Sequence, residues 1–132
     1  MKRLHLLLIP LFLISCAGSP TRISMMDQET LKTVDTLQLC AAYGCNHSEK
    51  IKAELERRNI FTEREWSLIN SKKISIGISI SALYASWGPP TSKNESVGKW
   101  GVHIQHVYGL YSRYSKPTYV YTDNGKVSSW QK

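Results

Sequence analysis

The sequence predicts an α+β domain in which N-terminal helices pack on a three-stranded antiparallel meander. Before Gly88, apolar residues recur at helical spacing. After it, the chain is rich in β-branched and aromatic residues, which is typical of strands. Pro89 and Pro90 follow Gly88 directly, a combination that ends a helix abruptly. Because the helices precede the strands, an α+β arrangement with the helices on one face of the sheet is favoured.

The N-terminal residues have the layout of a secretory signal. Lys2 and Arg3 precede an apolar run over residues 6–14. Pro10 interrupts this run, which is shorter than the roughly 20 residues that span a bilayer, so an uncleaved membrane anchor is not favoured. The run ends in Leu13-Ile14-Ser15-Cys16, which resembles a bacterial lipobox.

The lipobox resemblance implies cleavage before Cys16 and attachment of diacylglyceryl and acyl groups, such as palmitate, to that residue. Each methylene buried in the membrane contributes about 0.8 kcal/mol, so two or three chains make a firm anchor. Ala17 follows the cysteine, where lipoproteins retained in the inner membrane typically carry Asp. We therefore expect a lipid-anchored protein of the outer membrane that faces the periplasm.

The rest of the chain is long enough for one small domain. We divide the sequence into a signal peptide at 1–15, a lipidated flexible tether at 16–34, a helical segment at 35–72 and an α+β module at 73–132. The tether is assigned because its polar sequence has no sustained apolar periodicity. A flexible linker of this length has a root-mean-square reach of roughly 25 Å.

Positive charge is concentrated in the C-terminal half. Residues 16–66 hold seven basic and eight acidic side chains, a net charge of −1, whereas residues 67–132 hold eight basic and two acidic, a net charge of +6. This field suits anionic lipid headgroups, lipopolysaccharide phosphates or an acidic protein partner, and it also suits a merely solvated basic surface. An exported, anchored protein does not meet nucleic acid, so no nucleic-acid partner is expected.

Cys40 and Cys45 lie close together in the sequence. In an oxidising compartment such a pair favours a disulfide with a small loop. Two free thiols are an alternative, and a metal held with His47 is a weaker one, because no second Cys/His pair completes a tetrahedral site.

Capping signals define the helices of the helical segment. Asp35 caps a short helix that runs through Tyr43 and stops at Gly44. The run Asn46-His47-Ser48-Glu49 has the spacing of a capping box and opens a helix to Arg58. Thr62 and Glu65 form a second capping box, and Phe61 and Trp66 a hydrophobic staple, which together start a helix at Glu63 that ends near Asn70.

The C-terminal module carries one helix and three strands. Ser79 is the natural N-cap of a helix that ends at Gly88. Strands are predicted at 99–108, 117–121 and 126–130, with Asp123-Asn124-Gly125 as the turn between the last two. Period-two alternation places Tyr119 and Tyr121 on one face of the sheet and Val120 on the other.

From Ile74 to the C-terminus, the order of motifs resembles the SmpA/OmlA family of small outer-membrane lipoproteins, which includes the BamE component of the barrel-assembly machine. The residues that carry the resemblance are Gly77, Ser79, Leu83, Gly88, Pro90, Trp100, Tyr108, Tyr121, Asn124 and Gly125. The resemblance implies an α-α-β-β-β fold and a non-enzymatic scaffold role in outer-membrane protein assembly or envelope maintenance. β-Lactamase-inhibitor proteins share this architecture, so an inhibitor or regulator of an envelope enzyme is the alternative.

Residues suited to catalysis do not converge in the sequence. His103 and His106 are three positions apart on a predicted strand, so they point to opposite faces. Neither a nucleophile elbow nor a phosphate-binding glycine-rich loop occurs. We therefore expect no enzyme activity, no metal and no cofactor.

The segment 109–117 is the predicted place of partner contact. It lies between two strands and holds Tyr111, Arg113, Tyr114 and Lys116. Exposed aromatic residues mixed with arginine are typical of interface anchors, whereas the alternative is a solvated connecting loop.

Overall fold

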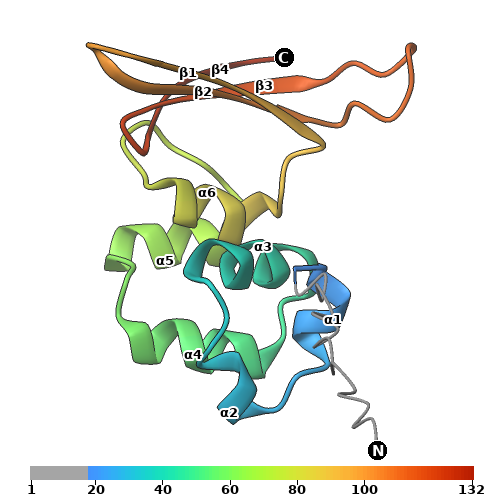
Figure 1. Cartoon of the computed structure of the whole chain (residues 1–132), viewed down its shortest axis with the longest axis vertical. Helices are drawn as coiled ribbons and strands as arrows, with labels where there is room; N and C mark the ends of the chain where they lie inside the picture. Colours follow the sequence, from blue (N-terminus) through green and yellow to red (C-terminus); the bar gives the residue numbers. More distant parts are fainter. Residues whose placement is uncertain (1–17) are drawn as a thin grey trace, which may run out of the picture.

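The structure, a computed structural model, describes residues 18–132, which form an α+β fold (Figure 1). The predicted signal peptide at 1–15 and the predicted lipidation site Cys16 lie outside the described residues. The helices are α1 (Pro20–Ser24), α2 (Gln28–Leu31), α3 (Thr36–Asn46), α4 (Glu49–Arg58), α5 (Glu63–Asn70) and α6 (Ile80–Trp87). The strands are β1 (Ser92–Gly98), β2 (Gly101–Tyr108), β3 (Thr118–Asp123) and β4 (Lys126–Gln131).

The helices and the sheet form separate layers, with α6 between the sheet and the remaining helices (Figure 1). α3 packs against α6 and α1, and the sheet is an antiparallel meander in the order β1-β2-β3-β4. The predicted α+β class is therefore confirmed. The prediction of three strands is wrong, because β1 precedes them as a fourth strand. Residues 92–97 of β1 are all exposed, so this strand lacks the apolar alternation by which strands are recognised.

The capping and turn signals in the sequence predict α5, α6 and the last hairpin correctly. The Thr62–Glu65 capping box is present, and Phe61 and Trp66 meet edge to face with ring centroids 5.1 Å apart. Ser79 Oγ accepts a hydrogen bond from the backbone N–H of Ala82 at the start of α6. Asn124 and Gly125 form the two-residue turn between β3 and β4, with φ of 49° and 85°.

The predicted flexible tether is wrong from Pro20 onward. α1 and α2 lie inside that range, and Ile23 and Leu31 are fully buried in the core. Ser19 caps α1 and Asp27 caps α2 through their side chains. Helices of four and five residues with one core contact each are too short to produce a recognisable period, so the sequence pattern missed them.

The sequence predicts that Gly44 ends this helix, but in the structure Gly44 lies inside α3. A Cβ at this position would lie 2.2 Å from the carbonyl oxygen of Tyr84 and 2.4 Å from the backbone nitrogen of Gly88. The glycine therefore allows α3 to cross the C-terminal end of α6 in backbone contact. His47, in the left-handed conformation, ends α3 instead, and α4 begins at Glu49 after Ser48, whose side chain makes no capping bond.

The extension of α3 also determines whether Cys40 and Cys45 can form a disulfide. Cys40 and Cys45 are both on α3, where a separation of five residues gives a rotation of about 140° and a rise of about 7.5 Å. A disulfide between them would require the helix to unwind. The favoured prediction of a disulfide is wrong for this fold, in which both thiols are free, Cys40 buried and Cys45 exposed.

A buried hydrogen-bonded chain joins α6 to the sheet. Tyr84 Oη lies 3.2 Å from His106 Nδ1, and His106 Nε2 lies 3.0 Å from Thr122 Oγ1. Burial lowers the pKa of His106 to about 4, so the ring is neutral at physiological pH. Neutral imidazole can donate through one nitrogen and accept through the other, which satisfies both hydroxyls in the core.

Candidate functional site

The candidate site is the connection 109–117, which joins β2 to β3 at one end of the sheet. Figure 1 shows this connection at the right end of the sheet, whereas the turns at 99–100 and 124–125 lie at the left end. Gly109, with φ of 81°, turns the chain out of β2. The backbone N–H of Leu110 donates to Thr91 Oγ1, and that hydroxyl donates to the carbonyl of Val107, so the base of the loop is fixed to the strand.

Two serines hold the tip of the loop in one shape. Ser115 Oγ accepts from the backbone N–H groups of Tyr111, at 3.2 Å, and Ser112, at 2.9 Å. The backbone N–H of Ser115 donates to the carbonyl of Ser112, and Ser112 Oγ accepts from the backbone N–H of Tyr114. Side-chain hydrogen bonds of this kind replace the ladder bonds that a loop lacks.

The side chains that project from this tip are large and exposed. Tyr111 is 84 % exposed, Tyr114 is 81 % exposed and Leu110 is 48 % exposed. The guanidinium of Arg113 lies over the Tyr114 ring, 5.0 Å from its centroid, and Lys116 on the same loop is also exposed. The four predicted contact residues are thus all exposed on this loop, and two of them, Arg113 and Tyr114, contact each other. Sequence reasoning missed Leu110, although an aliphatic residue next to exposed tyrosines is itself a signal.

The residues of the family resemblance occupy structural positions outside the loop 109–117. Leu83 is fully buried, Gly88 ends α6, and its carbonyl accepts a hydrogen bond from Tyr108 Oη at 3.0 Å. Trp100, which is 70 % exposed, lies over Gly98 in the turn between β1 and β2. These residues cap, turn and pack, so the structure gives them structural roles.

The outer face of the sheet carries a polar row that the sequence did not reveal. His103 Nδ1 lies 2.5 Å from Asp123 Oδ1, and Ser96 lies opposite His103 in the register of β1 and β2. Serine, histidine and aspartate are the three residue types of a hydrolytic triad. However, His103 and Asp123 are 41 % and 53 % exposed at the side chain, and none of the hollows described below includes this row. Side chains this exposed do not exclude water, so a surface hydrogen bond is the simpler role for this row.

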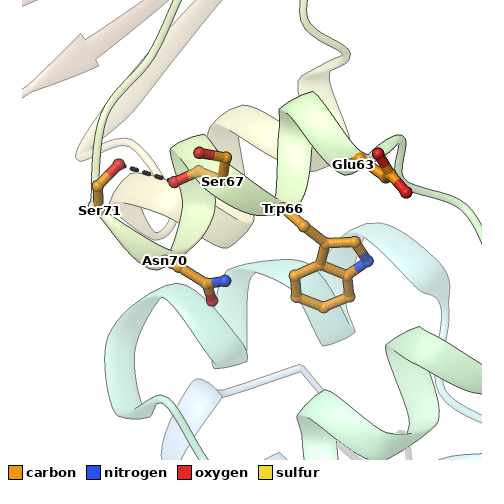
Figure 2. Close-up of a pocket in the computed structure, with 5 residues that line it drawn as sticks. All are labelled: Glu63, Trp66, Ser67, Asn70 and Ser71. Carbon is orange, nitrogen blue, oxygen red and sulfur yellow. Dashed lines mark hydrogen bonds between the residues drawn. The ribbon is translucent and has the colours of Figure 1, made fainter.

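One hollow, of about 580 Å³, lies along α5. Figure 2 shows Trp66 and Asn70 directed to the same side of α5 and Glu63 at the other end of the group, while Ser71 Oγ donates to the carbonyl of Ser67 at 2.8 Å. Glu63 is its single ionisable lining residue. Two further hollows, of about 410 and 570 Å³, lie beside α1 and beside the 77–79 segment. Over residues 18–132, no group of three His, Cys, Asp or Glu side chains is placed to hold a metal.

Comparisons with known proteins give no relative for this chain. No family model, no curated protein and no solved structure matches it. Within the described part of the chain, no helix is long and apolar enough to cross a bilayer.

Proposed function

We propose that this chain is a lipid-anchored outer-membrane protein that binds a protein partner in the periplasm through the loop 109–117 and catalyses no reaction. In this proposal it acts as a scaffold in outer-membrane protein assembly or envelope maintenance, as the SmpA/OmlA resemblance implies. The observation that carries the binding proposal is the near-complete exposure of Tyr111 and Tyr114 on a loop held by its own hydrogen bonds.

Exposure of this kind supports binding for an energetic reason. Tyrosine and arginine are the residues that dominate binding energy when an interface buries them. A loop already fixed by Ser112 and Ser115 loses little further conformational freedom on binding, so more of the contact energy appears as affinity. Arg113 and Lys116 add positive charge at the same place, which favours a partner with an acidic surface.

The loop is tested by cross-linked capture from cells. With Tyr111→Ala and Arg113→Ala combined, we expect capture of the partner to fall at least about tenfold, because truncated anchor residues typically cost 2 kcal/mol or more. The matched control is Lys99→Ala with Trp100→Ala, which removes a basic and an aromatic side chain from the turn at the opposite end of the sheet. We expect the control to capture normally.

Equal capture by the loop variant and the wild type would assign partner binding to another surface. The identity of the captured protein separates the two functional classes. Barrel-assembly proteins would support the scaffold role, whereas an envelope enzyme inhibited by the chain would replace it with the inhibitor role.

The anchor is tested by intact-mass analysis of the membrane-extracted protein beside a Cys16→Ser variant. We expect the wild type to lack residues 1–15 and to carry lipid mass, because the cysteine thiol is the attachment point in the lipobox resemblance. The Cys16→Ser variant has no such thiol and should remain unlipidated. A full-length, unlipidated wild-type product would contradict the envelope location.

A further inference from the structure

β1 presents an open edge. Within the described residues it pairs with β2 alone, and residues 92–97 are exposed throughout. The opposite edge of the sheet is partly covered, because the backbone of Gly77 and Ile78 exchanges hydrogen bonds with Val127 on β4. An open edge strand offers a row of backbone groups to which another strand can add.

The hydrogen bonds of β2 show which β1 groups face that edge. The backbone N–H of Val102 donates to Asn124 Oδ1, and its carbonyl accepts from the backbone N–H of Asn124, so Val102 directs its backbone groups away from β1. Val97 lies opposite Val102 and therefore exchanges no hydrogen bond with β2. Because the pattern alternates along an unbroken register, Lys93, Glu95 and Val97 direct their N–H and C=O groups to the open edge.

The charges on this edge are self-complementary in one register. When two copies of β1 pair antiparallel, each residue that directs its backbone groups to the open edge must lie opposite another such residue of the second copy. If the middle of the strand is paired, the two-fold axis that relates the copies therefore passes through Lys93, Asn94 or Glu95. An axis at Asn94 places Lys93 of each copy opposite Glu95 of the other. An axis at Lys93 or at Glu95 places like charges opposite each other, which is unfavourable.

We propose that β1 pairs antiparallel with β1 of a second copy of this chain, with the two-fold axis at Asn94, so that the two sheets become continuous. Ser92 then lies opposite Ser96 of the other copy, and both ion pairs lie on the same face of the joined sheet. A contact of one strand is much smaller than a standard interface, so the dimer should be weak, with a dissociation constant in the micromolar range.

The two ion pairs expected in this register can be tested by reversing the charge of one partner at a time. Lys93→Glu places carboxylates opposite each other in the homodimer, and Glu95→Lys places ammonium groups opposite each other. We expect either change to raise the dimer dissociation constant at least about tenfold, since two symmetric pairs change from attraction to repulsion. An equimolar mixture of the two variants should associate again, because opposite charges face each other in the mixed pair.

The measurement is sedimentation equilibrium of the full chain in density-matched detergent, with circular dichroism as the check on folding. A second variant, Glu95→Pro, removes an edge-facing N–H without removing a bond of the β1–β2 ladder, and it should be monomeric. A wild-type chain that stays monomeric up to about 1 mM, well above the expected range, overturns the proposal. Dimers that persist in Glu95→Pro overturn the proposal as well, because association would then use another surface. The same holds if mixing the two charge variants does not restore their association.

Discussion

Replacing Glu54 with alanine is expected to lower the free energy of unfolding by about 3–5 kcal/mol. The Glu54 side chain is fully buried on α4 and accepts two hydrogen bonds from Arg57, both at 2.8 Å, and one from Arg58, at 2.9 Å. Arg58 is 13 % exposed and also donates to Thr36 Oγ1 and to the carbonyl of Leu31. Removal of the carboxylate leaves this guanidinium buried without a counter-charge, which is the reason for the large effect.

The same carboxylate should confer acid sensitivity. Hydrogen bonds from Arg57, followed by those from Arg58, lower the pKa of Glu54 from 4.5 to about 2. The stability that Glu54 contributes is therefore complete above pH 4.5 and is lost as the pH falls through that value towards 2. Protonation of His106, with its lowered pKa, also favours the unfolded chain on acidification, so the comparison is made between matched variants rather than on the wild type alone.

Urea unfolding of Glu54→Ala, Glu54→Gln and an exposed control on the same helix, Glu56→Ala, measures both effects. At pH 7 we expect the control to lie within about 0.5 kcal/mol of the wild type. The wild type and Glu54→Gln should converge in stability as the pH falls from 4.5 to 3. A loss below about 1 kcal/mol for Glu54→Ala, the size expected of an exposed ion pair, would contradict the buried network.

Replacing Gly44 with alanine is expected to destabilise the protein by about 3 kcal/mol or more. Helix propensity alone predicts the opposite sign, since alanine in a helix interior is favoured over glycine by roughly 1 kcal/mol. The added Cβ, however, would overlap the backbone of Tyr84 and Gly88 at 2.2–2.4 Å, and backbone atoms cannot move aside as the end of a flexible side chain can. α3 and α6 must therefore separate.

Thermal and urea unfolding of Gly44→Ala beside Cys45→Ala checks the sign. Cys45 is exposed and adjacent on α3, and although its sulfur lies near Gly88, its truncation to alanine adds no atom to the crossing. We expect the control to remain within about 1 kcal/mol of the wild type. An unchanged or higher melting temperature for Gly44→Ala would mean that α3 and α6 do not approach as closely as described.

The elements that could be predicted from the sequence are those with local determinants. α5 begins at Glu63 because Thr62, Glu65, Phe61 and Trp66 lie within six consecutive residues and interact with one another. The Asn124-Gly125 turn is similarly local, because it depends on positive φ at two adjacent positions.

Two of the errors concern residues whose role depends on distant partners. Gly44 indicates a helix end by itself, yet here it is the contact point with α6, about 40 positions later in the chain. β1 becomes a strand by pairing with β2, although its own residues are polar and exposed. Surface features also differ in whether they can be recognised from local sequence. The loop 109–117 was visible as one continuous segment, whereas the row of Ser96, His103 and Asp123 requires the register of three strands.

The early start of the folded body changes how an anchored chain would move. α1 begins at Pro20, so a lipid on Cys16 would be joined to the domain by four residues, which span at most about 14 Å when extended. The domain would then lie against the headgroups as a body that swivels in the plane of the leaflet, without reaching far into the aqueous space. A partner would meet it by lateral diffusion within the same membrane, or would have to extend to the membrane surface itself.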